Sequence, residues 1–108
     1  MKNLAFAVIL VFSPALAGHA ADARTTWSDQ CVKCHGADGK GATKMGKKLG
    51  IKDYTDAKVQ ASFTDEQAFK ALKEGIKDTS GATRMKPVDG LSDADINGLV
   101  AHIRGLKK

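Results

Sequence analysis

The chain has 108 residues, and its 17 Lys and Arg against 12 Asp and Glu give a formal net charge of +5 at pH 7. A chain of this length forms one small domain, and its positive surplus is too modest and diffuse to argue for nucleic-acid binding, so we expect no nucleic-acid partner. Only 6% of its residues are aromatic, so the core needs support from a staple such as a metal or cofactor.

The first twenty residues have the pattern of a secretory signal peptide. Lys2 gives a positive start, residues 4–11 are apolar, and Ala15-Leu16-Ala17 is typical of a cleavage site. The apolar run is shorter than the about 20 residues that span a bilayer. We therefore predict a cleaved signal peptide over residues 1–20, a single domain over residues 21–108, no membrane insertion, and export, with the periplasm as the expected compartment in a bacterial source.

A metal- or cofactor-binding motif follows. Cys31 and Cys34 are the only cysteines of the chain, and His35 directly follows the second. This spacing is the attachment signature of a covalently bound c-type haem. We expect a helix here, capped at Thr25 or Thr26, that projects the three side chains from one face. The two thiols would then form thioethers with the haem, while the imidazole binds its iron.

Two other chemistries also use a Cys-x-x-Cys pair. A thioredoxin-like dithiol expects a strand before the motif and a mixed sheet around it, whereas this chain has few alternating β-branched runs and reads as all-helical. A structural zinc site needs four ligands, and beyond Cys31, Cys34 and His35 the chain offers only His102 and carboxylates. Both are weaker readings than haem attachment.

Residues 31–41, CVKCHGADGKG, resemble the haem-attachment helix and following turn of the class I c-type cytochromes, in particular small single-haem bacterial members. The resemblance extends over about residues 27–106. It implies an all-α, small cytochrome c fold, with three main helices and long loops wrapped around one covalently bound haem c. It also implies a single-electron carrier, not an enzyme, that shuttles electrons between donor and acceptor proteins as a monomer.

Residues 36–50 contain five glycines and predict an irregular loop. Lysines in and beside this loop either serve solubility or form a basic rim beside an exposed haem edge, which would steer an acidic partner. The proposed rim consists of Lys33, Lys40, Lys44, Lys47 and Lys48. The loop continues to residue 55, where Tyr54 either packs or donates to a haem propionate; packing is the favoured reading.

The sequence then predicts a helix that begins at a capping box formed by Thr64 and Gln67 and ends near Gly75. The helix is expected to bury Phe69, Leu72 and, at its end, Ile76. Residues 77–91 show no helical or strand period, and a loop of that length in so small a domain is usually functional.

The last helix is predicted to begin after Ser92, with Asp93 and Asp95 in its first turn. The apolar residues repeat with the spacing of a helix packed on a core. They are Ile96, Leu99, Val100 and Ile103.

A six-coordinate haem needs a second axial ligand, and Met1 leaves with the signal peptide. Met45 lies close to the motif in the glycine-rich loop, whereas Met85 lies in the long loop before the last helix. The resembled family has its distal methionine in such a loop, so the resemblance assigns this role to Met85. Lys86 stands between Met85 and Pro87, where the family often has Met directly followed by Pro.

A thioether ligand raises the reduction potential relative to two histidines and closes the sixth position, which favours a shuttle. His102 is the competing ligand, and we interpret it as a packing residue against Trp27. Two alternatives remain open: a haem subunit or domain partner of a larger oxidoreductase, and, if Met85 does not bind iron, a five-coordinate haem sensor or peroxidase.

Overall fold

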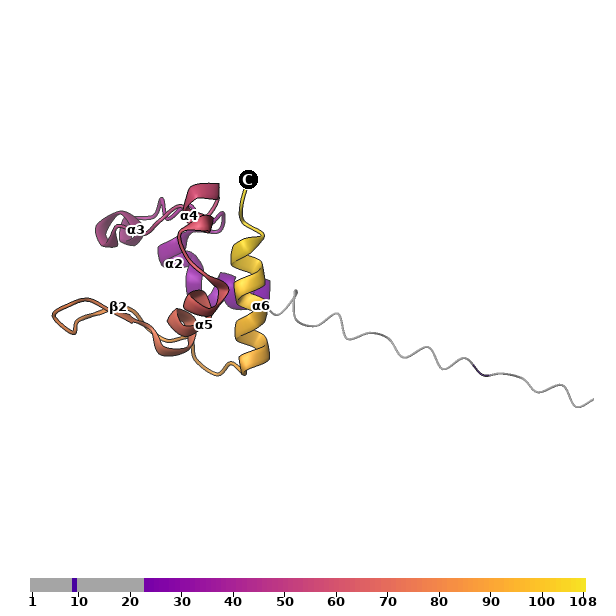
Figure 1. Cartoon of the computed structure of the whole chain (residues 1–108). Coiled ribbons are helices and arrows are strands. Elements are labelled where there is room, and N and C mark those ends of the chain that lie inside the picture. The colour runs from indigo at the N-terminus through magenta and orange to yellow at the C-terminus, as the bar shows by residue number, and fades with distance from the viewer. Residues whose placement is uncertain (1–8, 10–22) are drawn as a thin grey trace, which may run out of the picture.

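The computed structural model describes Ile9 and residues 23–108, so nearly all of the predicted signal peptide lies outside the described residues. Residues 23–26 are helical and run directly into η1 (Trp27–Cys31) and α2 (Val32–His35). The elements that follow are α3 (Lys44–Leu49), α4 (Ala57–Ala61), α5 (Asp65–Glu74), β1 (Ile76–Lys77), β2 (Thr83–Met85) and α6 (Asp93–Arg104) (Figure 1). No helix in this part of the chain is long and apolar enough to cross a membrane.

The first helix begins upstream of the predicted cap. Thr26 has helical dihedral angles, φ −61° and ψ −42°, and its side chain makes no capping hydrogen bond. The prediction of a cap at Thr25 or Thr26 was wrong, because the helical backbone already includes residues 23–26. Within the helix, the N–H of Val32 donates to the carbonyl of Trp27, which makes residues 27–31 a wide π-helical turn, a feature often found at functional sites.

The core lies where the first helix meets α5 and α6 (Figure 1). The predicted stripe of α6 is confirmed, since all four of its apolar residues are buried, and Leu99 is completely inaccessible. Trp27, Cys31 and Leu72 complete the centre of this core. The capping box at Thr64 and Gln67 is confirmed as well, and Ser92 forms a second one with Asp95. The two predicted helices therefore begin where their side chains satisfy the free N–H groups.

The glycine-rich segment contains a short helix that the sequence analysis missed. Thr43 caps α3 by accepting a hydrogen bond from the N–H of Gly46, and Gly50 ends it in the left-handed conformation at φ +66°. The predicted irregular loop over residues 36–50 was therefore wrong in this part. Its glycines lie at the turns and at a close helix contact, so their number did not indicate an unfolded segment.

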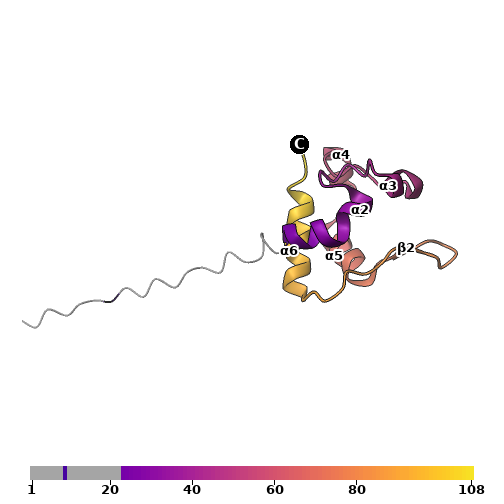
Figure 2. The ribbon, with the colours of Figure 1, turned by 180° about the vertical axis from the view of Figure 1, so that it is seen from behind.

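The segment after α5 forms an antiparallel β-hairpin, in which Ile76 pairs with Met85. Figures 1 and 2 show this hairpin and α3 projecting from the same side of the helical frame. The predicted lack of regular structure over residues 77–91 was wrong for the strands. The predicted burial of Ile76 was also wrong, since Gly75 ends α5 and Ile76, in β1, is 44% exposed.

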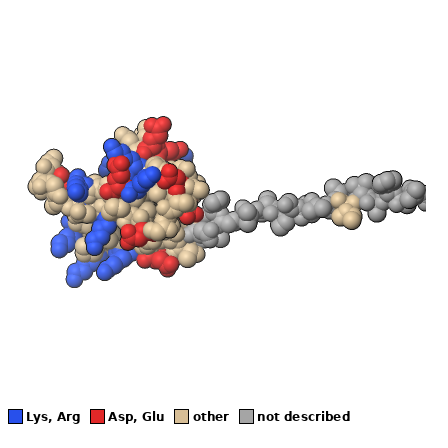
Figure 3. Space-filling view, turned by 90° about the horizontal axis from the view of Figure 1, so that it is seen from below, with Lys and Arg blue, Asp and Glu red and all other residues tan. Residues whose placement is uncertain are grey.

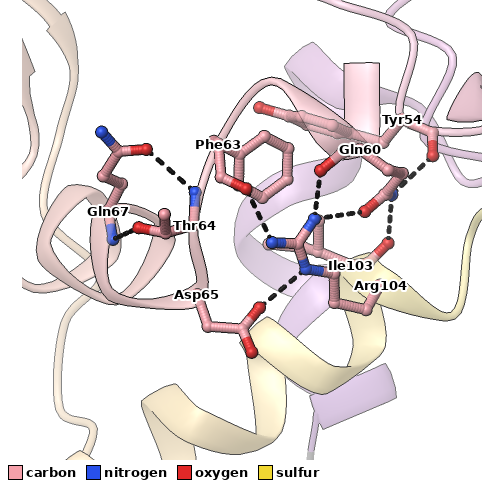
Figure 4. Close-up of polar contacts among 8 residues, drawn as sticks. All are labelled: Tyr54, Gln60, Phe63, Thr64, Asp65, Gln67, Ile103 and Arg104. Carbon is pink, nitrogen blue, oxygen red and sulfur yellow. Dashed lines mark hydrogen bonds and ion pairs between the residues drawn. The ribbon is translucent and has the colours of Figure 1, made fainter. Parts of the chain in front are cut away.

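A polar network joins the segment before α5 to the end of α6 (Figure 4). The Nε2 of Gln60, a buried side chain, donates to the carbonyls of Tyr54 at 2.7 Å and Ile103 at 2.8 Å. The guanidinium of Arg104 donates to the carbonyl and Oε1 of Gln60 and to the carbonyl of Phe63. These bonds hold residues 54–63 against the last helix.

Candidate functional site

A cavity of about 830 Å³ lies between the first helix, α3, α5 and the hairpin. Its size falls within the roughly 300–1,000 Å³ of small-molecule and cofactor sites. Cys31, Cys34 and His35 all line it. The structure therefore brings the three side chains of the predicted attachment motif to one surface.

Both remaining methionines, Met45 from α3 and Met85 from β2, line the same cavity. Met85 also packs against the buried core cluster. His102 is not among the residues that line the cavity; its ring centroid lies 5.1 Å from that of Trp27. The predicted packing of His102 on Trp27 is confirmed.

The imidazole of His35 lies between two aromatic side chains. Its ring stacks on Tyr54 with centroids 5.5 Å apart and lies 5.6 Å from the ring of Trp27. The favoured reading of Tyr54 as a packing residue agrees with this contact. Burial lowers the pKa of His35, which favours the neutral imidazole, the form that binds a metal ion. The buried Nδ1 has no hydrogen-bond partner among the described residues.

The Cys31 thiol does not have the environment of a reactive thiol. Burial, and to a smaller extent the neighbouring Cys34, raises the pKa of Cys31 to about 11. Catalytic dithiols instead depend on a lowered thiol pKa, so this environment argues against the thioredoxin-like alternative. Over the part of the chain described, no three His, Cys, Asp or Glu side chains gather to hold a metal ion.

Three contacts hold the motif in place. The Nε1–H of Trp27 donates to the carbonyl of Gly36 at 3.1 Å, and the hydroxyl of Thr43 donates to the carbonyl of Cys34. Gly46 packs so closely that a Cβ there would lie 2.7 Å from the Cys34 oxygen. The sequence analysis missed Thr43 and Gly46, although a threonine before a short basic segment ending in Gly50 is a signal for a capped helix.

Comparison with known protein families agrees with this arrangement of the site. A model of the cytochrome c family matches residues 20–107. The chain belongs to the cytochrome c family. The predicted small all-α cytochrome c fold is thereby confirmed, with the short β-hairpin as an addition.

Named relatives span most of the chain. It is 29% identical over 91 residues to cytochrome c-554(547) of Halothiobacillus neapolitanus, which covers 84% of this chain and 100% of the relative. It is 33% identical over 73 residues to cytochrome c-554(548) of Halomonas halodenitrificans, covering 67% and 78%. Among solved structures, the KustC0563 c-type cytochrome superposes with a TM-score of 0.68 at 32% identity, over 81% of this chain and 99% of its own.

Membership of this family defines the cofactor and the general activity. The cytochrome binds haem c covalently, and it is a haem-based electron carrier that exchanges electrons with redox partner proteins. The residues around the cavity fit such a group, because they combine two thiols, an imidazole and thioethers with a largely apolar lining. When bound, the haem supplies the one-electron chemistry of its iron, and the protein supplies its binding site and its orientation.

Proposed function

We propose that this cytochrome is a single-electron shuttle, with thioether attachment at Cys31 and Cys34 and with His35 and Met85 as axial ligands. The observation that carries the proposal is that these four side chains, from two ends of the chain, line one cavity. His35 is half-buried, and this burial lowers its pKa, which favours the neutral form that a proximal ligand requires. The shuttle is monomeric and does not transform a substrate.

The choice of Met85 over Met45 rests on packing. Met85 belongs to a paired strand and packs against the core, so its backbone has a defined depth beside the cavity. Met45 lies on α3, a short helix outside the core cluster. A thioether in the sixth position favours ferrous iron, raises the reduction potential and keeps small molecules off the iron.

Absorption spectra of the haem-loaded protein test the ligand assignment. Haem should stay attached after denaturation and extraction with acidic organic solvent, since thioether bonds survive both. The ferric protein should show the far-red charge-transfer band of a methionine–iron bond, which Met85→Ala abolishes and the matched variant Met45→Ala retains. A band that persists in Met85→Ala would refute this ligand assignment, and a wild-type protein without the band would support the five-coordinate alternative.

We further propose that the lysines of the basic rim face the redox partners. Lys33, Lys40, Lys44, Lys47 and Lys48 are all exposed. Figure 3 shows several Lys and Arg side chains gathered at the lower left of the face in view. Such a surface would attract acidic donor and acceptor proteins.

The proposal includes export. The sequence pattern of residues 1–20 supports a cleaved signal peptide, with residues 21–108 as the working domain in the periplasm. Mass spectrometry of the haem-loaded protein purified from a periplasmic fraction tests it. An intact N-terminus, or recovery only from the cytoplasm, contradicts this part of the proposal.

A further inference from the structure

Gly75 and Met85 lie unusually close together at the end of α5. Gly75 ends this helix with φ +77°, a conformation that L side chains rarely adopt. A Cβ at this position would lie 2.5 Å from the carbonyl oxygen of Met85 and 2.9 Å from Cδ of Pro87. The backbone that follows the Met85 side chain therefore rests directly against the glycine.

Neither neighbour is able to move aside by a simple side-chain rotation. One is a backbone oxygen and the other belongs to the rigid ring of Pro87. Real Cβ contacts essentially never fall below 3.0 Å. A methyl group at position 75 would therefore push the segment that carries Met85 away from α5 by about 0.5 Å or more, the difference between the two distances.

The same segment is also held on either side of this contact. Met85 pairs with Ile76 in the hairpin, and the N–H of Val88 donates to the carbonyl of Leu72 at 3.0 Å. Leu72 is a buried residue of the core. These contacts fix the position of Met85 beside the cavity relative to α5. The segment that carries Met85 comes closest to the end of α5 at Gly75.

We propose that Gly75 is a positioning residue for axial ligation: the absence of its side chain sets the depth at which Met85 enters the cavity. This inference rests on the proposed function, in which Met85 binds the iron. A residue that controls the distance of the thioether from the iron controls the strength of that bond, and with it the reduction potential and the ease with which external ligands displace the methionine.

The test compares two alanine variants of the haem-loaded protein. Gly81 lies in the connection between β1 and β2 with φ +84°, yet a Cβ there meets nothing within 4 Å. Gly81→Ala therefore also places a side chain at positive φ, but without a contact like that at Gly75. The readouts are the far-red methionine band, the reduction potential, and the affinity of the ferric haem for imidazole, which competes with the distal ligand.

We expect Gly75→Ala to weaken the band, lower the reduction potential and raise the imidazole affinity about tenfold, equivalent to about 1.4 kcal/mol. Gly81→Ala should stay within about twofold of the wild type, equivalent to about 0.4 kcal/mol. Equal imidazole affinities in the two variants, with equal losses of stability, would overturn the inference. If Met85→Ala loses the band while Gly75→Ala and Gly81→Ala bind imidazole equally well, the proposed function stands. Only the role of Gly75 is then refuted.

A second pair covers the case in which Gly75→Ala does not mature with haem. Asparagine occurs at positive φ more often than alanine and also carries a Cβ. Gly75→Asn therefore keeps the contact with Met85, and Gly81→Asn is its control. The same difference in imidazole affinity is expected between these two, and its absence refutes the role of Gly75.

Discussion

The buried amide of Gln60 provides a sharp test of the network that joins residues 54–63 to α6. Its Nε2 is a donor to two carbonyl oxygens, those of Tyr54 and Ile103. Gln60→Glu keeps the shape of the side chain but replaces this donor with an oxygen. Both carbonyls then face an acceptor in a buried place.

The expected cost follows from the contacts that change. The Tyr54 carbonyl loses its donor at 2.7 Å, and leaving a buried acceptor unpaired costs about 1–3 kcal/mol. The Ile103 carbonyl also accepts from the N–H of Leu106, so it loses only one of two bonds, about 1 kcal/mol. A charged bond to Arg104 offsets about 1 kcal/mol. The net loss is about 2 kcal/mol, or a fall in Tm of about 10 °C for a domain of this size.

Gln67→Glu is the matched control. Gln67 is exposed, and only its Oε1 is used, as the acceptor from the N–H of Thr64. Glutamate preserves that bond and adds a negative charge near the N-terminus of α5, where it is favourable by up to about 1 kcal/mol. Guanidinium and thermal unfolding of both haem-loaded variants at pH 7, followed by circular dichroism, give the comparison. The reasoning fails if Gln60→Glu is as stable as Gln67→Glu.

Three further predictions concern the motif, the core and the surface. Gly46→Ala should destabilise the protein by about 1–2 kcal/mol in guanidinium unfolding, because the new Cβ would clash with the Gly41 carbonyl oxygen. This loss is expected despite a gain of about 1 kcal/mol in helix propensity. A variant as stable as the wild type would contradict the close contact. Burial, followed by the charge of Arg24, lowers the pKa of His102, so the unfolded chain binds more protons and stability should fall as the pH drops below about 6.5. Unfolding curves of His102→Phe at pH 7.5 and 5.5 should lack this component of the loss, and an unchanged pH dependence would contradict it. Stopped-flow electron exchange with an acidic partner should slow as ionic strength rises toward 0.15 M, where charges are screened beyond about 8 Å, and a rate independent of salt would remove the role of the basic rim.

Local patterns in the sequence were sufficient to predict the helices that contribute the buried core residues. The capping box at Thr64 and the Ser92 cap act within one turn, and the apolar stripe of α6 depends only on helical periodicity. The attachment motif is equally local, since Cys31, Cys34 and His35 follow one another along one helix. Family resemblance then extended these patterns to the whole fold.

Other features depend on contacts between distant segments, which no local pattern contains. The burial of Gln60 requires a partner in α6, and the hairpin became visible only through the pairing of Ile76 with Met85. Thr25 and Thr26 are good capping residues that the longer helix placed in its interior. In the glycine-rich segment, Gly46 is needed for the close approach of α3 to Cys34. The glycine content alone predicted an irregular loop there.

The sequence by itself thus determined the attachment chemistry, the core helices and a methionine to be tested as the second ligand, because each depends on residue type and short spacing. The tertiary structure alone decided that Met85 lines the same cavity as the motif and that its backbone lies against Gly75, at the end of α5. The physical reason is that the depth of a side chain in a cavity is set by backbone contacts between segments far apart in the chain, and those contacts exist only after folding.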